Sequence, residues 1–230
     1  MSRPPRSQPR ISANELALYM VSSDTARMGI IRRAAEPQPF VVTRYQDVRG
    51  AIKAYLSDVG RRRNALVEAD ALFQQRLADL SQSDVRQDDA RQSLEVIAAL
   101  QAMDNQLASY NFVDAANSQP KLTISGVEVS VRADLWVQGQ QRGEEQIGGA
   151  ILRMTQDQGA RRDEMGRYVA TLVRMHLDQN NPSNRTPSNR LCMAVDIRHG
   201  QVFTAPNSNT RRVNDLQAAC RVIHALWGQA

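Results

Sequence analysis

Cysteine is scarce in this chain, which contains only Cys192 and Cys220 among its 230 residues. Two cysteines so far apart form neither a disulfide framework nor a close metal-ligand motif. We therefore expect reduced thiols that are buried in a core. A structural zinc site joining them to histidines is the alternative, although each histidine is isolated and none makes an HExxH or HxH spacing. The three histidines are His176, His199 and His224.

Long apolar runs are missing as well. No stretch approaches the roughly 18 consecutive apolar residues that a membrane-spanning helix needs. The first ten residues are rich in proline and arginine, and no apolar run follows them, so we expect no signal peptide. This composition predicts a cytoplasmic protein without membrane contact. Residues 1–10 are expected to form a disordered basic tail, and residues 11–230 a single domain.

The motifs of several enzyme classes are also absent. The sequence has no GxxxxGK[ST] phosphate loop, no GxGxxG dinucleotide fingerprint and no serine in a nucleophile-elbow context. Gly148-Gly149 is too short for a phosphate loop, and we expect it to permit a bulge or the close approach of another backbone. Aromatic residues make up 5% of the chain and do not alternate with arginines, which argues against a platform that stacks single-stranded bases.

Lysine is nearly absent from a basic chain. The formal net charge is +5 and the pI is about 9.7, yet only Lys53 and Lys121 among the 29 basic residues are lysines. A GC-rich coding genome and selection for guanidinium groups that bind phosphates would both produce this bias. Arginine runs either contact phosphates or lie on a solvated surface, paired with nearby acids. The candidate nucleic-acid-binding residues are Arg61, Arg62 and Arg63, with Arg32 and Arg33 as further candidates.

Hydrophobic periodicity predicts an α/β (α+β) fold. Apolar residues recur every three or four positions through most of residues 11–87, which predicts a mainly helical N-terminal part, and Ser12 and Glu15 have the spacing of a capping box. Residues 88–230 combine helical spacing with period-two alternation, which predicts a mixed sheet flanked by helices. We expect helices at about 11–20, 24–33, 45–58, 61–80, 88–110, 162–178 and 210–227, and strands at 40–43, 121–124, 127–137, 148–154, 191–196 and 201–204.

The order of elements between about residues 90 and 205 is a helix, a three-stranded meander, a helix and a strand. It resembles the αβββαβ core of the restriction-endonuclease-like PD-(D/E)XK superfamily. In that superfamily the second strand carries an aspartate, and the third carries a second carboxylate followed two positions later by a lysine. The stretch from Ile124 to Leu135 resembles the first part of this pattern, with Asp134 at the position of the aspartate. Residues 149–154 contain neither a carboxylate nor a lysine.

This departure implies a degenerate active site. The nuclease mechanism needs at least two carboxylates to hold Mg²⁺ or Mn²⁺, and a single aspartate binds such ions poorly. The remaining site candidates beside Asp134 are Arg153, which is cationic but cannot act as a base, and Glu95 on the preceding helix. We therefore predict no metal site and no cofactor, with Mg²⁺ or Mn²⁺ bound only if the chain is an active nuclease.

Three functional hypotheses follow. The leading one is a catalytically inactive nuclease-like module that binds DNA, RNA or a protein partner attached to nucleic acid. The first alternative is a structural or regulatory protein-interaction module, a homodimer with no role in nucleic-acid binding. The second is an active metal-dependent nuclease that uses Asp134.

Overall fold

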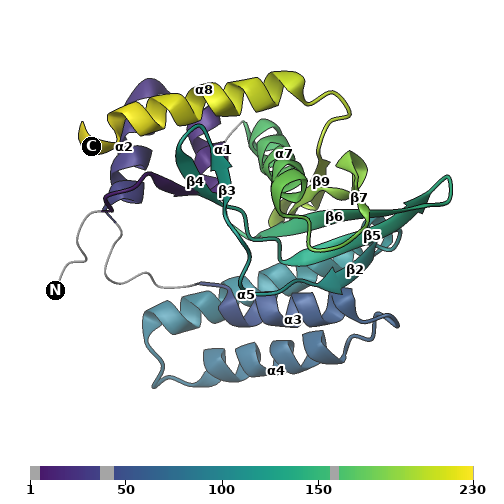
Figure 1. The fold of residues 1–230 in the computed structure, drawn as a ribbon. Coiled ribbons are helices and arrows are strands. Elements are labelled where there is room, and N and C mark those ends of the chain that lie inside the picture. The colour runs from purple at the N-terminus through teal and green to yellow at the C-terminus, as the bar shows by residue number, and fades with distance from the viewer. Residues whose placement is uncertain (1–5, 37–43, 156–160, 230) are drawn as a thin grey trace.

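The computed structural model describes residues 6–36, 44–155 and 161–229. Helices cover both faces of a mixed sheet, and a smaller sheet stands to one side of it (Figure 1). This architecture confirms the predicted α/β class. The strand predicted for residues 40–43 lies outside the described residues. None of the helices among the described residues combines the length and apolar character that crossing a bilayer requires.

The main sheet consists of an antiparallel meander followed by a parallel crossover. Its strands lie in the order β2-β5-β6-β8-β9, with β7 beside β6. Strands β2, β5 and β6 are antiparallel neighbours, whereas β8 runs parallel to β6 and β9 antiparallel to β8. Helix α7 (Arg162–Asn180) makes the crossover that a parallel pair requires. The strands are β2 (Asn111–Asp114), β5 (Leu135–Gln141), β6 (Glu144–Arg153), β7 (Thr186–Pro187), β8 (Met193–Asp196) and β9 (Gln201–Thr204).

The smaller sheet corrects one strand prediction. Its order is β1-β4-β3, with β1 (Arg10–Ser12) parallel and β3 (Leu122–Ile124) antiparallel to β4 (Val127–Ser130). The strand predicted over residues 127–137 is therefore two strands, because the chain leaves the small sheet after β4 and enters the main sheet at β5. The first strand of the main meander is accordingly β2, which the periodicity did not predict.

The prediction of a disordered tail over residues 1–10 is wrong for residues 6–10. Arg10 begins β1, where backbone hydrogen bonds tie it to the small sheet. The backbone N–H of Arg6 donates to the carbonyl of Ala35, and the indole N–H of Trp227 donates to the carbonyl of Arg6 at 2.9 Å. These hydrogen bonds hold the segment against the ends of two helices, which composition alone does not reveal. Residues 1–5 lie outside the described part of the chain.

Two helical layers cover the main sheet. Helices α3, α4 and α5 bury one face and form the α5-side core, whereas α7 buries the other and forms the α7-side core together with α1, α2, α8 and the small sheet. Alternation along β6 divides its residues between them, with Leu152 in the α5-side core and Ile151 in the α7-side core. The helices are α1 (Ala13–Val21), α2 (Asp24–Ala35), α3 (Gln46–Ser57), α4 (Asn64–Ala78), α5 (Asp84–Ala102), α6 (Asp104–Leu107) and α8 (Thr210–Leu226), with 3₁₀ turns η1 (Asn189–Leu191), η2 (Ile197–His199) and η3 (Trp227–Gln229).

Two local predictions are confirmed. The backbone N–H of Glu15 donates to the Ser12 hydroxyl, and the Glu15 carboxylate accepts the backbone N–H of Ser12, which is the capping box predicted for the start of α1. At Gly148, an added Cβ would lie 2.0 Å from the carbonyl oxygen of Leu191. Strand β6 therefore needs glycine at this point because η1 crosses directly against its backbone.

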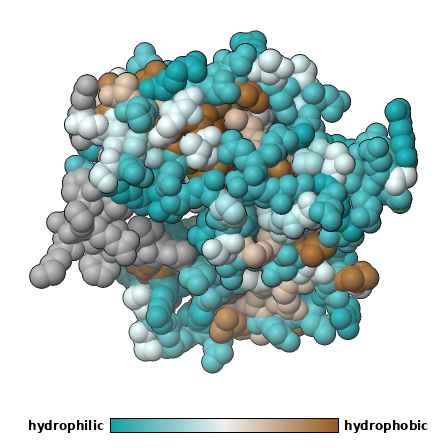
Figure 2. All heavy atoms as spheres, viewed as in Figure 1, coloured by the Kyte–Doolittle hydropathy of each residue, from teal (hydrophilic) through white to brown (hydrophobic). Residues whose placement is uncertain are grey.

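The face shown in Figure 2 is mostly hydrophilic, with apolar side chains in small groups. The most exposed large apolar side chains, Val59 and Leu80, lie in the two connections that flank α4. Single exposed apolar residues are normal on a folded protein. They therefore identify no docking surface.

Candidate functional site

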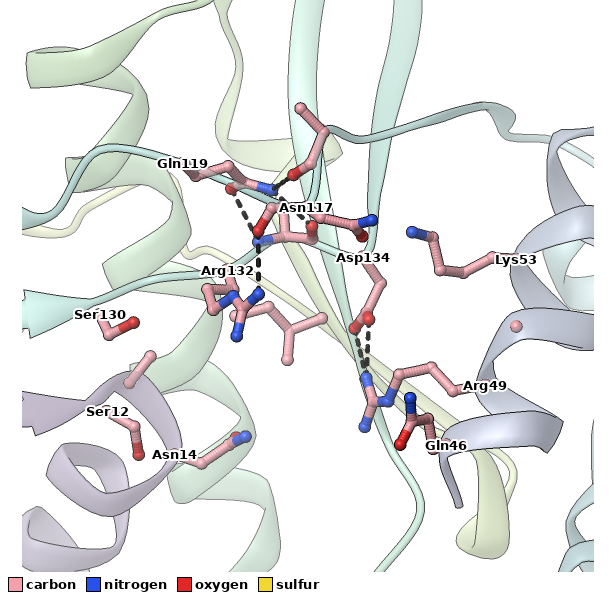
Figure 3. Close-up of a pocket in the computed structure, with 15 residues that line it drawn as sticks. Ser12, Asn14, Gln46, Arg49, Lys53, Asn117, Gln119, Ser130, Arg132 and Asp134 are labelled. Carbon is pink, nitrogen blue, oxygen red and sulfur yellow. Dashed lines mark hydrogen bonds and ion pairs between the residues drawn. The ribbon is translucent and has the colours of Figure 1, made fainter. Parts of the chain in front are cut away.

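A polar pocket lies between α1 and α3, at the point where the chain enters β5 (Figure 3). Its volume is about 510 Å³, which is within the range of pockets that bind small molecules. Its charged lining residues are Arg49 and Lys53 from α3, Arg132 from the segment after β4, and Asp134 immediately before β5. The pocket therefore contains Asp134, the carboxylate at the aspartate position of the nuclease-like pattern.

Hydrogen bonds and an ion pair hold Asp134 in place immediately before β5. Its backbone N–H donates to the carbonyl of Ala150, and its carboxylate accepts the backbone N–H of Leu152 at 2.8 Å, so it is tied to β6. Nη1 of Arg49 lies 2.7 Å from both carboxylate oxygens. The side chain of Asp134 is only 11% exposed. Both oxygens thus already accept hydrogen bonds from the chain itself, and the negative charge faces a guanidinium.

Helix α3 forms one wall of the pocket. The residues of α3 that line the pocket recur at helical spacing, so they share the face of α3 that adjoins its buried stripe. They are Gln46, Arg49, Gly50 and Lys53. Lys53 lies with its ammonium 2.9 Å from the Asp114 carboxylate, which is 65% exposed. Because water screens an ion pair with so exposed a carboxylate, Lys53 still presents positive charge to the pocket.

The opposite wall comes from the start of α1 and the segment around Arg132. Arg132 donates from Nη2 to the carbonyl of Asn117 at 2.9 Å, and its side chain lies across the pocket from Arg49 and Lys53 (Figure 3). Gln119 braces this wall, because its amide exchanges hydrogen bonds with the backbone of Ala133. Ser12, the N-cap of α1, also lines the pocket, which puts the positive end of the helix dipole at its edge.

The pocket carries more positive than negative charge. Its lining contributes three cations and one carboxylate, and that carboxylate is neutralised by Arg49. Guanidinium groups, an ammonium and free helix N–H groups are the donors that bind phosphates and carboxylates in proteins. The arrangement favours binding of an anion, with Arg49 unavailable as a base because a guanidinium does not deprotonate.

The third strand brings an apolar residue to the pocket. Ile151 on β6 lines it, while Arg153, two residues further on, is buried elsewhere with its Nη1 3.7 Å from the Asp196 carboxylate. In the described residues, no group of three or more histidine, cysteine or acidic side chains is arranged to hold a metal ion. Of the three candidates for the degenerate site, the structure thus places Asp134 in the pocket and Arg153 outside it.

Glu95 also lies outside the pocket. Its carboxylate is paired with Arg198 of η2, at the contact between α5 and the end of β8. The side chain of Arg198 is 8% exposed, so Glu95 neutralises a nearly buried cation. Its position indicates a structural role in attaching α5 to the sheet.

The arginines predicted to contact phosphates do not line the pocket. Arg61 donates to the carbonyls of Leu107 and Tyr110, whereas Arg62 pairs with Asp58 and Arg63 with Asp104. The contacts of Arg61 and Arg63 connect the α3–α4 loop to the chain around α6, whereas the Arg62 pair lies within the loop. The other pair, Arg32 and Arg33, is exposed in the last turn of α2.

The histidines and cysteines are dispersed. Cys192 and Cys220 are buried free thiols, as predicted, and burial raises the pKa of both to about 12. His176 is 1% exposed within α7, and burial lowers its pKa from the usual value of 6.5. These residues form no zinc-like cluster among the described residues.

Sequence reasoning missed Arg49, Lys53 and Arg132. A signal was present, because Gln46, Arg49 and Lys53 make a polar stripe at helical spacing and Lys53 is one of only two lysines. The meeting of that stripe with Asp134 is a tertiary contact between residues 85 positions apart, which no local pattern encodes.

In comparisons with known proteins, no protein-family model matches the chain, and no curated protein is significantly similar to it in sequence.

Proposed function

We propose that this chain is a catalytically inactive nuclease-like module that binds nucleic acid, with a phosphate group of the nucleic acid held in the pocket between α1 and α3. The observation that carries the proposal is the pocket itself. It combines three cations with Asp134, the residue at the aspartate position of the nuclease-like pattern.

The strand arrangement supports the likeness to the nuclease core. Helix α5 precedes the antiparallel strands β2, β5 and β6, and α7 then leads to β8, which is parallel to β6. Asp134 stands at the start of the second strand of this series, next to the end of the third. The likeness consists of the order of the elements and the position of Asp134, and it is an analogy.

The contacts of Asp134 support the absence of catalysis. A hard divalent cation is bound by several oxygen ligands, usually including more than one carboxylate. Here the neighbouring residue of the third strand is Ile151, and both oxygens of Asp134 accept hydrogen bonds from Arg49. The positive charge that a metal ion would supply against this carboxylate comes instead from a guanidinium.

Fluorescence anisotropy with labelled single-stranded and duplex oligonucleotides tests the proposal. The affinity is expected to fall as salt rises from about 50 to about 200 mM, because each neutralised phosphate releases counterions. The double variant Lys53→Gln/Arg132→Gln should weaken binding at least about tenfold. Its matched control is Lys121→Gln/Arg211→Gln, which removes the same charge from the residue before β3 and from α8 and should bind as the parent does.

Two results would contradict the proposal. Cleavage that depends on Mg²⁺ or Mn²⁺ and is lost in Asp134→Asn would identify an active nuclease. Failure to bind any oligonucleotide at low salt would favour the protein-interaction alternative, for which light scattering should then detect a homodimer.

A further inference from the structure

The pocket is the right size for one nucleotide. About 510 Å³ between α1, α3 and the start of β5 accommodates a single small ligand, whereas a nucleic-acid duplex is far wider than such a pocket. Gly50 on the α3 wall shows how open it is, because an added Cβ there would meet no atom within 4 Å. A nucleic-acid strand that reaches this pocket therefore places a single nucleotide in it.

The charges of the pocket match a doubly charged phosphate. Arg49 pairs with Asp134, and Lys53 pairs with Asp114, whose exposed carboxylate is screened by water, so Lys53 on one wall and Arg132 on the other supply the positive charge. The start of α1 also borders the pocket, where the Glu15 carboxylate already accepts hydrogen bonds from the N–H and the hydroxyl of Ser12. A phosphate monoester carries about −1.5 to −2 at neutral pH, whereas an internal diester carries a single charge. Two opposed cations are thus better matched by the monoester.

Amide side chains on both walls distinguish a nucleotide from inorganic phosphate. Asn14 lies at the start of α1 and Gln46 at the start of α3, both lining the pocket, and neither side chain has a hydrogen-bond partner within the described residues (Figure 3). An amide offers both donors and an acceptor, which is the complement of the edge of a base. The free amides and the cations lie in one cavity.

We infer that the pocket binds a nucleotide that ends in a phosphate monoester, either at the terminus of a nucleic-acid strand or as a free nucleoside monophosphate. The inference rests on the proposed function for the class of ligand and goes beyond it in assigning terminal rather than internal phosphate. Lys53 and Arg132 hold the phosphate, and Asn14 and Gln46 contact the base or the sugar.

The test compares one internally labelled single strand in three forms, with a 5′-phosphate, with a 3′-phosphate and with hydroxyl groups at both ends. One phosphorylated form is expected to bind at least about tenfold more tightly than the hydroxyl form. Because only Lys53 and Arg132 take part, a fourfold rise in salt should lower the affinity roughly sevenfold, less than a long backbone interface would show.

Substitutions at two helical glycines provide the matched control. Gly50→Met places a side chain in the open space of the pocket and should abolish the preference for a terminal phosphate. Gly29→Met makes the same change on α2, where an added Cβ meets only the flexible Arg33 side chain at 3.5 Å, and should keep the preference. Circular dichroism verifies that both variants fold.

The outcomes separate the inference from the proposed function. In a competition assay, a mixture of nucleoside monophosphates is added to displace the labelled phosphorylated strand. Displacement at concentrations equal to that of the strand would support a free nucleotide as the ligand. Displacement only at much higher concentrations would support the strand terminus. Equal binding of all three strands with dependence on Lys53 and Arg132 would overturn the inference and leave the proposed function. Binding of monophosphates without any strand would overturn the proposed function alone, and no binding of either would overturn both.

Discussion

The contacts of Asp134 connect β5, β6 and α3. Its backbone and carboxylate bond to β6, and Arg49 reaches it from α3. One side chain therefore links two strands of the sheet to a helix of the α5-side layer. Removing the carboxylate would leave Arg49 without its partner and the Leu152 N–H without its acceptor. Asp134→Asn, used above as a test for catalysis, must for this reason be accompanied by a measurement of stability.

Gly50 gives a prediction on stability at the scale of one residue. It lies inside α3 with open space around it, so an added methyl group meets no steric obstacle. Glycine in a helix interior is less favourable than alanine by about 0.5–1 kcal/mol. Gly50→Ala should raise the free energy of unfolding by about that amount, measured by urea denaturation. A lower free energy of unfolding in the variant would contradict this prediction, because it would mean that position 50 needs a backbone conformation other than the helical one in the structure.

His176 gives a prediction on pH. Burial in α7 lowers its pKa below 6.5, so the unfolded chain binds its proton more readily than the folded chain does. The contribution of His176 to stability is therefore present above about pH 6.5 and is lost as the pH falls below it, by at most about 1.4 kcal/mol per pH unit. Urea denaturation between about pH 7.5 and pH 5 should show this decline.

The variant His176→Gln is the control for this pH dependence. Glutamine carries no titratable group, so the decline should be shallower in the variant, whatever its stability at pH 7. The other two histidines, His199 and His224, are unchanged in it. An identical slope in the two proteins would assign the acid sensitivity to other groups.

At the scale of elements, Arg61 and Arg63 of the arginine triplet join separate segments, whereas Arg62 pairs within its own loop. Arg61 bonds to the carbonyls of Leu107 and Tyr110, and its guanidinium lies 5.3 Å from the centre of the Phe112 ring. It thereby fastens the connection between α3 and α4 to the chain between α6 and β2. Composition could not distinguish this arrangement from a phosphate-binding surface, since the same residue type serves both.

Substitution of Arg61 tests this role. Arg61→Ala should lower the free energy of unfolding by about 1–3 kcal/mol, because a charged hydrogen-bond donor to two carbonyls is lost. Arg62→Ala, whose partner Asp58 lies on the same exposed loop, should change it by less than about 0.5 kcal/mol. Thermal denaturation of both variants measures the difference. If their effects were equal, the link between the two segments would not contribute to stability.

At the scale of the whole molecule, two cores share one sheet. Side chains of alternating direction on β5 and β6 belong to the α5-side core and to the α7-side core, so loosening either face disturbs the strands that support the other. The candidate pocket lies where the two layers meet, with α1 on one side and α3 on the other. Its shape therefore depends on both cores being folded.

This sharing predicts cooperative unfolding. Trp136 and Trp227 both pack in the α7-side core, whereas far-UV circular dichroism also includes helices α3, α4 and α5. Thermal unfolding followed by tryptophan fluorescence and by circular dichroism should have coincident midpoints, within about 1 °C. An earlier transition in the dichroism would show that the α5-side helices melt while the rest remains folded.

The sequence by itself determined the class of fold, most helices, the capping box and the close approach of another backbone at Gly148. These features depend on local spacing, which is written directly in the order of residues. The division between the two sheets was not predictable, because alternating valines such as Val127 and Val129 satisfy either sheet equally well. Only the tertiary structure decided that Arg49 pairs with Asp134 and that Lys53 lines the same pocket, since the packing of α3 against the sheet brings together residues that are distant in the chain.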